Sequence, residues 1–502
     1  MNAPLRRVGV IILVMFGLLF ANLNWVQAYK ADEYRTSPYN LGRVQIDEYQ
    51  RQRGPILVGP DGTAVATSVE TDGRLRYLRT YPEGERWAHV VGYRAVNLGA
   101  AGIEQFANEF LAGSGDRFFV DRVRDLLTGG QTGGGTVVTT LSRGAQQTAY
   151  EQLRDNRTGT NRGAVVAIDP RTGAVQALVS MPSFDPNPLA SHDVAEAQAA
   201  YRELNEAPGR PLANRAISER FAPGSVFKII DAAAALATGE YTPGSRVTGG
   251  AEYLAPTAGR PIGNAPGVVC PTNITLEQAF VVSCNTAFSH LAAEELGGQA
   301  IREMAEAFGF GAQLTLGQLD ADGMPVATST VGELTREDGQ YDAPTVALSA
   351  IGQASVQITP LQGAMIAATV ANGGVQMQPY LVEQLQDAQL RTVYRASPEQ
   401  LRRPISPEVA AALQDMMIGV VERGTGTNAR ISGYVVGGKT GTAETGTGDR
   451  EHGWFVGFVL VDGEPVSAVA VFLENAGTGG SAEAARIAGQ VMHAVVAERG
   501  ES

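Results

Sequence analysis

The stretch PGSVFKIIDAAAAL at residues 223–236 pairs a serine with one of the chain's rare lysines, and it points to the fold. Pro and Gly end a loop, and the apolar run after them predicts a helix with Ser225 in its first turn. Lys228 is three residues further on and shares a helix face with Ser225. A serine hydroxyl becomes a good nucleophile when a base lies within hydrogen-bond reach. Alone the pair is a weak signal, because about one lysine in twenty has a serine at that spacing.

Lysine usage makes this pair more informative. Of 39 basic residues only three are lysines, at positions 30, 228 and 439. Arginine keeps its proton in proteins, whereas a lysine can lose it when burial and a second cation lower its pKa. A lysine retained in so arginine-rich a chain is therefore a candidate for amine chemistry, although three leftovers at random positions would give the same count.

Two further motifs follow in the same region. Ser283-Cys284-Asn285 precedes a predicted helix over residues 286–296, where it could be no more than a helix N-cap. GGKTGT at residues 437–442 follows an apolar strand at residues 434–436. It presents Lys439, Thr440 and Thr442, together with Gly441, whose missing side chain lets a ligand backbone approach.

S-x-x-K, S-x-N and K-T-G in this order are the active-site set of penicillin-binding proteins and class A β-lactamases. The chain resembles a class B penicillin-binding protein, a monofunctional peptidoglycan D,D-transpeptidase of the PbpA type. The resemblance spans nearly the whole length. The supporting segments are RGPI at 53–56, GIE at 102–104, AIDPRTG at 167–173, IGQ at 351–353, TPLQ at 359–362 and WFVG at 454–457.

The resemblance implies a role for each motif residue. Ser225 would attack a terminal D-Ala-D-Ala carbonyl, Lys228 would take its proton, and Ser283 would pass a proton to the leaving D-Ala. The remaining roles are substrate binding by Asn285, Lys439, Thr440, Gly441 and Thr442, with an oxyanion hole from the backbone N–H groups of Ser225 and Thr442. No metal or organic cofactor is expected. The implied partners are peptidoglycan stem peptides, β-lactam antibiotics, a membrane glycan polymerase and a division or elongation complex.

The N-terminus predicts a membrane anchor. Arg6 and Arg7 precede an apolar run long enough to span a bilayer, which favours a short cytoplasmic tail at 1–7 and an anchor at 8–28. A cleaved signal peptide ending near Ala28 is the alternative. Either way the rest of the chain is expected outside the cytoplasm, and the anchor places the protein in a bacterial plasma membrane.

The exported part is expected to contain two domains. A strand-rich, non-catalytic pedestal is assigned to residues 29–155, with a helix at 102–111 and a glycine-rich loop near 128–135. A transpeptidase domain of the α+β class is assigned to residues 156–502. Hairpins at 165–179 and 454–473, with the strand before Lys439, predict a five-stranded antiparallel sheet packed by helices.

Cys270 and Cys284 are the only cysteines. Export permits a disulfide between them, although two buried free thiols are the alternative. Cys284 also stands where class A β-lactamases carry Asp in S-x-N, which counts mildly against a β-lactamase.

Composition excludes some functions and leaves others open. A net charge of −13 argues against a nucleic-acid partner, and the five histidines lack metal-ligand spacing. A β-lactamase or β-lactam sensor of the same fold remains an alternative, as does a catalytically silent scaffold of a membrane complex. Rapid loss of a bound fluorescent penicillin would distinguish a β-lactamase from a transpeptidase.

Overall fold

The catalytic half is built on a five-stranded antiparallel sheet, which confirms the predicted one. Its order is β17-β18-β19-β5-β6. The strands are β5 (Gly163–Ile168), β6 (Val175–Met181), β17 (Val435–Ala443), β18 (His452–Val461) and β19 (Glu464–Leu473). The computed structural model describes residues 2–30, 48–59, 62–114, 133–319, 322–445 and 450–501. Because β17 is the outer strand, the K-T-G motif that it carries lies at an open sheet edge.

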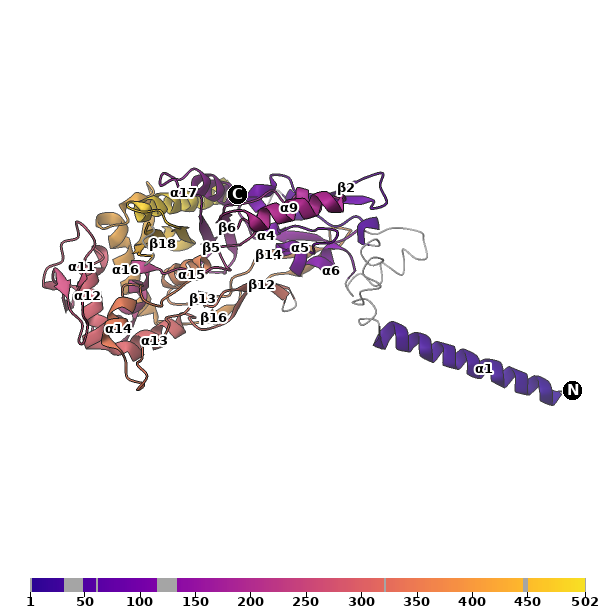
Figure 1. The fold of residues 1–502 in the computed structure, drawn as a ribbon, viewed down its shortest axis with the longest axis horizontal. Coiled ribbons are helices and arrows are strands. Elements are labelled where there is room, and N and C mark those ends of the chain that lie inside the picture. Colours follow the sequence, from indigo (N-terminus) through magenta and orange to yellow (C-terminus); the bar gives the residue numbers. More distant parts are fainter. Residues whose placement is uncertain are drawn as a thin grey trace.

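Both faces of this sheet are covered by helices, so its strands read as near-continuous apolar runs. Alternate residues of β5 belong to different cores: Val165 packs with helices α8 (Arg143–Arg154) and α17 (Gly480–Glu501). Val166 belongs to the core that also contains residues of α15 (Pro360–Ala371), α16 (Pro407–Arg423) and α10 (Lys228–Ala237). Figure 1 shows α17 and α15 on opposite sides of β5 and β18. The sheet is therefore the central layer of three.

Helix starts in this half follow the expected capping chemistry. The Thr359 hydroxyl accepts the Gln362 N–H at the start of α15, and the Ser406 hydroxyl accepts the Val409 N–H at the start of α16. Each helix has proline in its first turn. The helix predicted at 286–296 instead divides into α12 (Asn285–His290) and a wider π-helical segment, η5 (Leu291–Leu296).

The first region forms a second sheet of six strands in the order β15-β14-β4-β1-β2-β3. Four strands come from the first region itself: β1 (Ile56–Val58), β2 (Thr63–Glu70), β3 (Tyr77–Thr80) and β4 (Thr136–Thr139). The other two, β14 (Val382–Gln386) and β15 (Thr392–Arg395), come from far along the chain. These two strands therefore lie in the sheet of the first region although they follow the predicted domain boundary at residue 155.

A buried ion cluster holds the first region together. Glu104 is fully buried and pairs with Arg53 Nε at 2.7 Å and with Arg79 Nε at 2.6 Å. It lies on α5 (Gly102–Phe106), which breaks at Ala107 before α6 (Asn108–Leu111), where the sequence predicts a single helix. Asn108 turns its side-chain oxygen to Arg53 at 2.8 Å, which ties the break to this cluster. Most of the predicted glycine-rich loop, residues 128–132, lies outside the described residues.

The N-terminal apolar run forms one helix, α1 (Asn2–Asn24), followed by a π turn, η1 (Trp25–Tyr29). Residues 6–24 are long and apolar enough to cross a membrane, and none of that window is buried against the protein. Figure 1 shows α1 standing clear of the folded body.

The remaining described elements connect these layers. They are α4 (Gly84–Val91), η3 (Pro188–Ala190), α9 (Val194–Glu206), η4 (Gly224–Phe227), β7 (Arg246–Thr248), β8 (Glu252–Tyr253), β9 (Ile262–Gly263), β10 (Asn273–Thr275), α11 (Leu276–Val281), α13 (Gly297–Ala307), β11 (Leu314–Leu319), β12 (Asp322–Val326), α14 (Ala343–Ser349), β13 (Gln376–Met377), β16 (Gln400–Arg402) and η6 (Thr427–Ala429).

Candidate active site

Ser225 sits in η4, a tight helical turn that leads directly into α10. The turn packs so closely on β17 that a Cβ at Gly224 would lie 2.3 Å from the Thr442 carbonyl oxygen. Gly224 also has a φ of +55°, a conformation that favours glycine, and its N–H donates to the Gly352 carbonyl at 3.1 Å. These contacts fix the serine against the strand that carries K-T-G.

Lys228 is the first residue of α10 and is fully buried. Its amine donates to Asn285 Oδ1 at 2.7 Å, to the Ser283 carbonyl at 2.9 Å and to the Ser283 hydroxyl at 3.3 Å. In the described part of the chain, no hydrogen bond joins this amine to the Ser225 hydroxyl. The two residues are nevertheless one helical turn apart, as the motif predicts.

Ser283 lies between α11 and α12 with a φ of +62°, an uncommon conformation for a residue with a side chain. Its hydroxyl accepts hydrogen bonds from both buried amines, that of Lys228 at 3.3 Å and that of Lys439 at 2.9 Å. The S-x-N motif therefore bridges the helix that carries S-x-x-K and the strand that carries K-T-G.

The K-T-G residues lie in the second half of β17 and alternate in direction. Lys439 is fully buried, and its amine also donates to the Thr440 carbonyl at 3.1 Å. The hydroxyls of Thr440 and Thr425 are 2.5 Å apart. At Gly441 a Cβ would meet the Pro223 carbonyl oxygen at 2.5 Å, so this position lets the Ser225 turn approach. Thr442 is exposed, and its hydroxyl donates to that of Ser481 at 3.4 Å.

Burial makes both amines unusually weak bases. Desolvation, reinforced by the nearby charge of Lys439, lowers the pKa of Lys228 well below its ordinary value. Desolvation lowers the pKa of Lys439 to about 7. A neutral amine able to take a proton is therefore accessible near neutral pH.

Five of the site residues line one cleft of about 770 Å³, whereas the fully buried Lys228 and Lys439 do not line it. Ser225, Ser283, Asn285, Thr440 and Thr442 all line it. The segment between β8 and β10 also lines the cleft, including residues 260–266. The cleft is large enough to hold a peptide in contact with Ser225.

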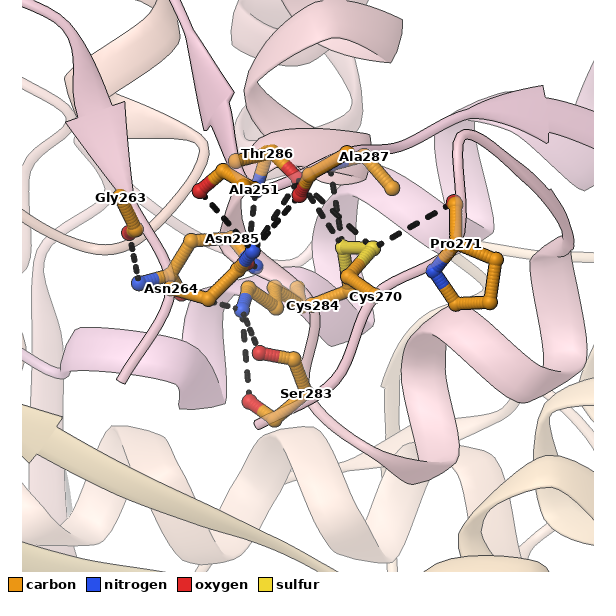
Figure 2. The surroundings of a disulfide bond; sticks show 12 residues. Ala251, Gly263, Asn264, Cys270, Pro271, Ser283, Cys284, Asn285, Thr286 and Ala287 are labelled. Atoms are coloured by element: carbon orange, nitrogen blue, oxygen red, sulfur yellow. Dashed lines mark hydrogen bonds between the residues drawn. A yellow bond between two sulfur atoms is a disulfide. The ribbon is translucent and has the colours of Figure 1, made fainter. Parts of the chain in front are cut away.

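The structure joins Cys270 and Cys284 through a disulfide with Cα atoms 5.8 Å apart, and no free cysteine remains. Figure 2 shows this bond beside Asn285 and the start of α12. Of the two alternatives for the cysteine pair, the structure adopts the bridged one, which ties the cleft-lining loop to S-x-N.

Some residues of the site carry no sequence signal that would have identified them. Thr425 follows α16 and Asn264 belongs to an irregular loop, yet each contacts a motif residue. Asp231 is buried one turn beyond Lys228, where desolvation raises the pKa of its carboxyl well above the ordinary value. A polar residue in the apolar run after Lys228 was the only available hint for Asp231.

Comparisons with known proteins agree with this geometry. A family model described as the penicillin binding protein transpeptidase domain matches residues 163–493. A second, the penicillin binding protein A dimerisation domain, matches residues 53–137.

Curated relatives match over almost the full length. Peptidoglycan D,D-transpeptidase PbpA of Mycolicibacterium smegmatis is 41% identical over 503 residues, covering 99% of this chain and 99% of that protein. The protein of the same name from Mycobacterium tuberculosis is 40% identical over 506 residues, covering 99% and 98%.

Solved structures are similar as well. Penicillin-binding protein A from M. tuberculosis, in its imipenem acyl-enzyme complex, has a TM-score of 0.83 at 39% identity over 90% of this chain and 100% of that one. Its penicillin G acyl-enzyme complex has a TM-score of 0.80 at 38% identity over 89% and 99%. The chain therefore belongs to the penicillin-binding protein transpeptidase family.

Proposed function

We propose that this protein is a peptidoglycan D,D-transpeptidase that works through an acyl-enzyme on Ser225. The observation that carries the proposal is the Ser283 hydroxyl held between two buried amines, in the lining of the same cleft as Ser225. A serine nucleophile needs a neutral base nearby, and these amines lose their protons more readily than exposed lysines do.

In the first step Ser225 Oγ attacks the carbonyl carbon of the penultimate D-Ala, and its proton passes to the Lys228 amine. Lys228 must release one of its present acceptors to do this, because it already donates to Ser283 and Asn285. The backbone N–H groups of Ser225 and Thr442 stabilise the oxyanion. The C–N bond then breaks, Ser283 passes a proton to the leaving D-Ala amine, and an ester to Ser225 remains.

In the second step an amine from a neighbouring stem peptide attacks this ester. A new amide bond forms, the Ser225–acyl bond breaks, and the proton returns to the serine oxygen through the same groups. Thr440 and Thr442 bind the substrate carboxylate, Lys439 supplies positive potential, Gly441 gives the substrate backbone room, and Asn285 holds the acyl side chain. β-Lactams acylate the same serine, as acyl-enzyme structures of the M. tuberculosis relative support.

The membrane arrangement follows from the N-terminus. Residues 8–28 anchor the protein in the plasma membrane, with residues 1–7 in the cytoplasm because Arg6 and Arg7 precede the apolar run. Residues 29–155 act as the pedestal, whose sheet is completed by the strands β14 and β15, and the rest of residues 156–502 act as the transpeptidase domain. A membrane glycan polymerase supplies the strands to be crosslinked, within a division or elongation complex.

The test is exposure of purified protein to a fluorescent penicillin, followed by intact mass and peptide mapping. The expected result is one adduct, on Ser225, that persists for many minutes and is absent from Ser225→Ala. Loss of the label within seconds would instead identify a β-lactamase. No adduct at any antibiotic concentration would point to the silent scaffold.

A further inference from the structure

The loop between β9 and β10 carries an asparagine that reaches the S-x-N motif. Asn264 Oδ1 accepts the backbone N–H of Asn285 at 2.8 Å and that of Thr286 at 3.2 Å. Its Nδ2 donates to the Gly250 carbonyl at 2.8 Å. Figure 2 shows Asn264 directly against the first turn of α12. One side chain thus connects the cleft wall to the residue that binds the Lys228 amine.

α12 needs an external acceptor at this point. The first N–H groups of a helix have no partner within the helix and are normally met by the N-cap side chain. Here the N-cap is Cys284, whose sulfur is bonded to Cys270 and accepts the Ala287 N–H at 3.3 Å. The side-chain oxygen of Asn264 accepts the two preceding N–H groups of the helix, those of Asn285 and Thr286.

The loop that carries Asn264 is anchored at several points. Thr286 Oγ1 donates to the Gly250 carbonyl at 2.8 Å, which is the same carbonyl that Asn264 binds. Asn285 Nδ2 donates to the Gly263 carbonyl at 3.1 Å. The disulfide from Cys270 to Cys284 closes the far end of the loop. These contacts restrain Asn264 relative to α12.

Displacement of α12 would move one of the hydrogen-bond acceptors of Lys228, the proposed catalytic base. Asn285 Oδ1 accepts the Lys228 amine at 2.7 Å, so the position of the first helical residue sets one of the three acceptors around that amine. A hydrogen bond to the charged form of an amine favours that form. Loss of this acceptor should therefore lower the pKa of Lys228 as well as misplace its nitrogen.

We propose that Asn264 is a positioning residue for acylation, which holds Asn285 and through it the Lys228 amine. This inference rests on the proposed function. Asn264 itself does not touch the reacting atoms; its side-chain oxygen fixes the backbone of the residue that does.

The experiment compares Asn264→Leu, which has similar size and no acceptor, with Asn264→Asp, which keeps the accepting oxygen. Ser406→Ala is the matched control, because it removes a helix-capping oxygen from α16 outside the cleft. For each variant we would measure the acylation rate with a fluorescent penicillin against pH, amide hydrogen exchange in residues 283–290, and the thermal midpoint.

Asn264→Leu should acylate about 10- to 100-fold more slowly, because a small misplacement of a catalytic group can cost about that much in rate. The acid limb of its pH–rate profile for acylation should move to lower pH, because the pKa of Lys228 falls. The backbone amides of Asn285 and Thr286 should exchange faster. Asn264→Asp keeps the acceptor but loses the donor to the Gly250 carbonyl, so it should recover only part of the rate. Ser406→Ala should lower only the thermal midpoint. If Asn264→Leu fails to fold, Asn264→Ser truncates the side chain with less apolar bulk and carries the same expectations.

An Asn264→Leu protein that acylates at the wild-type rate with an unmoved acid limb would overturn the inference and leave the proposed function standing. A loss of rate that merely parallels the thermal midpoint, as in a general folding defect, would overturn it too. If the wild-type protein forms no adduct, the proposed function fails and this inference with it.

Discussion

Lys228 and Lys439 are both fully buried, yet they differ in what surrounds them. Lys228 contacts three acceptors from the S-x-N motif, whereas Lys439 contacts Ser283 and its own strand. The base role requires an amine that can lose its proton, and arginine cannot do so.

Lys228→Arg should therefore lower the acylation rate by about 100- to 10,000-fold, the usual range for loss of a general base. The positive charge is kept, so a purely electrostatic role for Lys228 would leave much more activity. Stopped-flow measurement with a fluorescent penicillin checks this, with Arg154→Lys, an exposed exchange on α8, as the control. A Lys228→Arg rate within about threefold of wild type would contradict the base role.

Lys439 affects the basicity of Lys228. The charge of Lys439 lowers the pKa of Lys228, so its removal in Lys439→Met should raise that pKa. Acylation is lost where the base is protonated, so the acid limb of the pH–rate profile should move to higher pH. Loss of the positive potential should also slow the plateau rate about 100-fold. A pH series of acylation rates checks both effects, and an acid limb that stays in place would contradict the coupling.

The motif residues could be predicted from sequence because rare lysines and fixed spacings identify them. Thr425 and Asn264 could not, because their contacts with Thr440 and Asn285 arise only when distant segments pack together. Asp231 was equally hidden, since its burial depends on the helices that surround α10.

Among the elements, the turn η4 depends most on its neighbours. Its glycine combines a positive φ with contact against β17, so no side chain fits there. Gly159 also has a positive φ, of 74°, but a methyl group added there would have no atom within 4 Å. Comparing substitutions at Gly224 and Gly159 therefore separates the cost of a strained backbone from the cost of a steric clash.

Gly224→Ala should destabilise the protein by at least about 2 kcal/mol and slow acylation strongly, because the added methyl pushes Ser225 away from Thr442. Gly159→Ala should cost only about 1 kcal/mol and leave acylation unchanged. Chemical denaturation and acylation rates measure the two effects. Equal acylation rates in both variants would show that η4 tolerates displacement from β17.

The hairpins β5–β6 and β18–β19 were predictable, because turn residues separate two apolar runs in each. The break at Ala107 was not, because it depends on the hydrogen bond that Arg53 donates to the side-chain oxygen of Asn108. The π-helical continuation of α12 likewise follows no local sequence signal.

On the scale of the whole molecule, the two halves share a sheet. β14 pairs with β4, so a segment that follows α15 in the catalytic half completes the sheet of the first region. No sequence pattern in residues 382–395 indicates that this segment pairs with β4. The sequence alone therefore suggests two separate regions.

Shared strands should make the halves unfold together. Glu104→Ala leaves two buried arginines without their carboxylate and should cost about 3–5 kcal/mol. Calorimetry should show a single transition at lower temperature, with penicillin-binding capacity lost over the same range. Glu70→Ala breaks an exposed pair with Arg76 and should cost no more than about 1 kcal/mol. Two separate transitions in Glu104→Ala would contradict the coupling.

The late arrival of β14 bears on how the protein is made. A chain synthesised from its N-terminus delivers β1 to β4 long before residues 382–386 emerge to cover the outer edge of β4. During that interval the edge is open to pairing with other chains. The sheet of the first region therefore cannot be completed until residues 382–395 have been made, so β4 keeps an unpaired edge through much of synthesis.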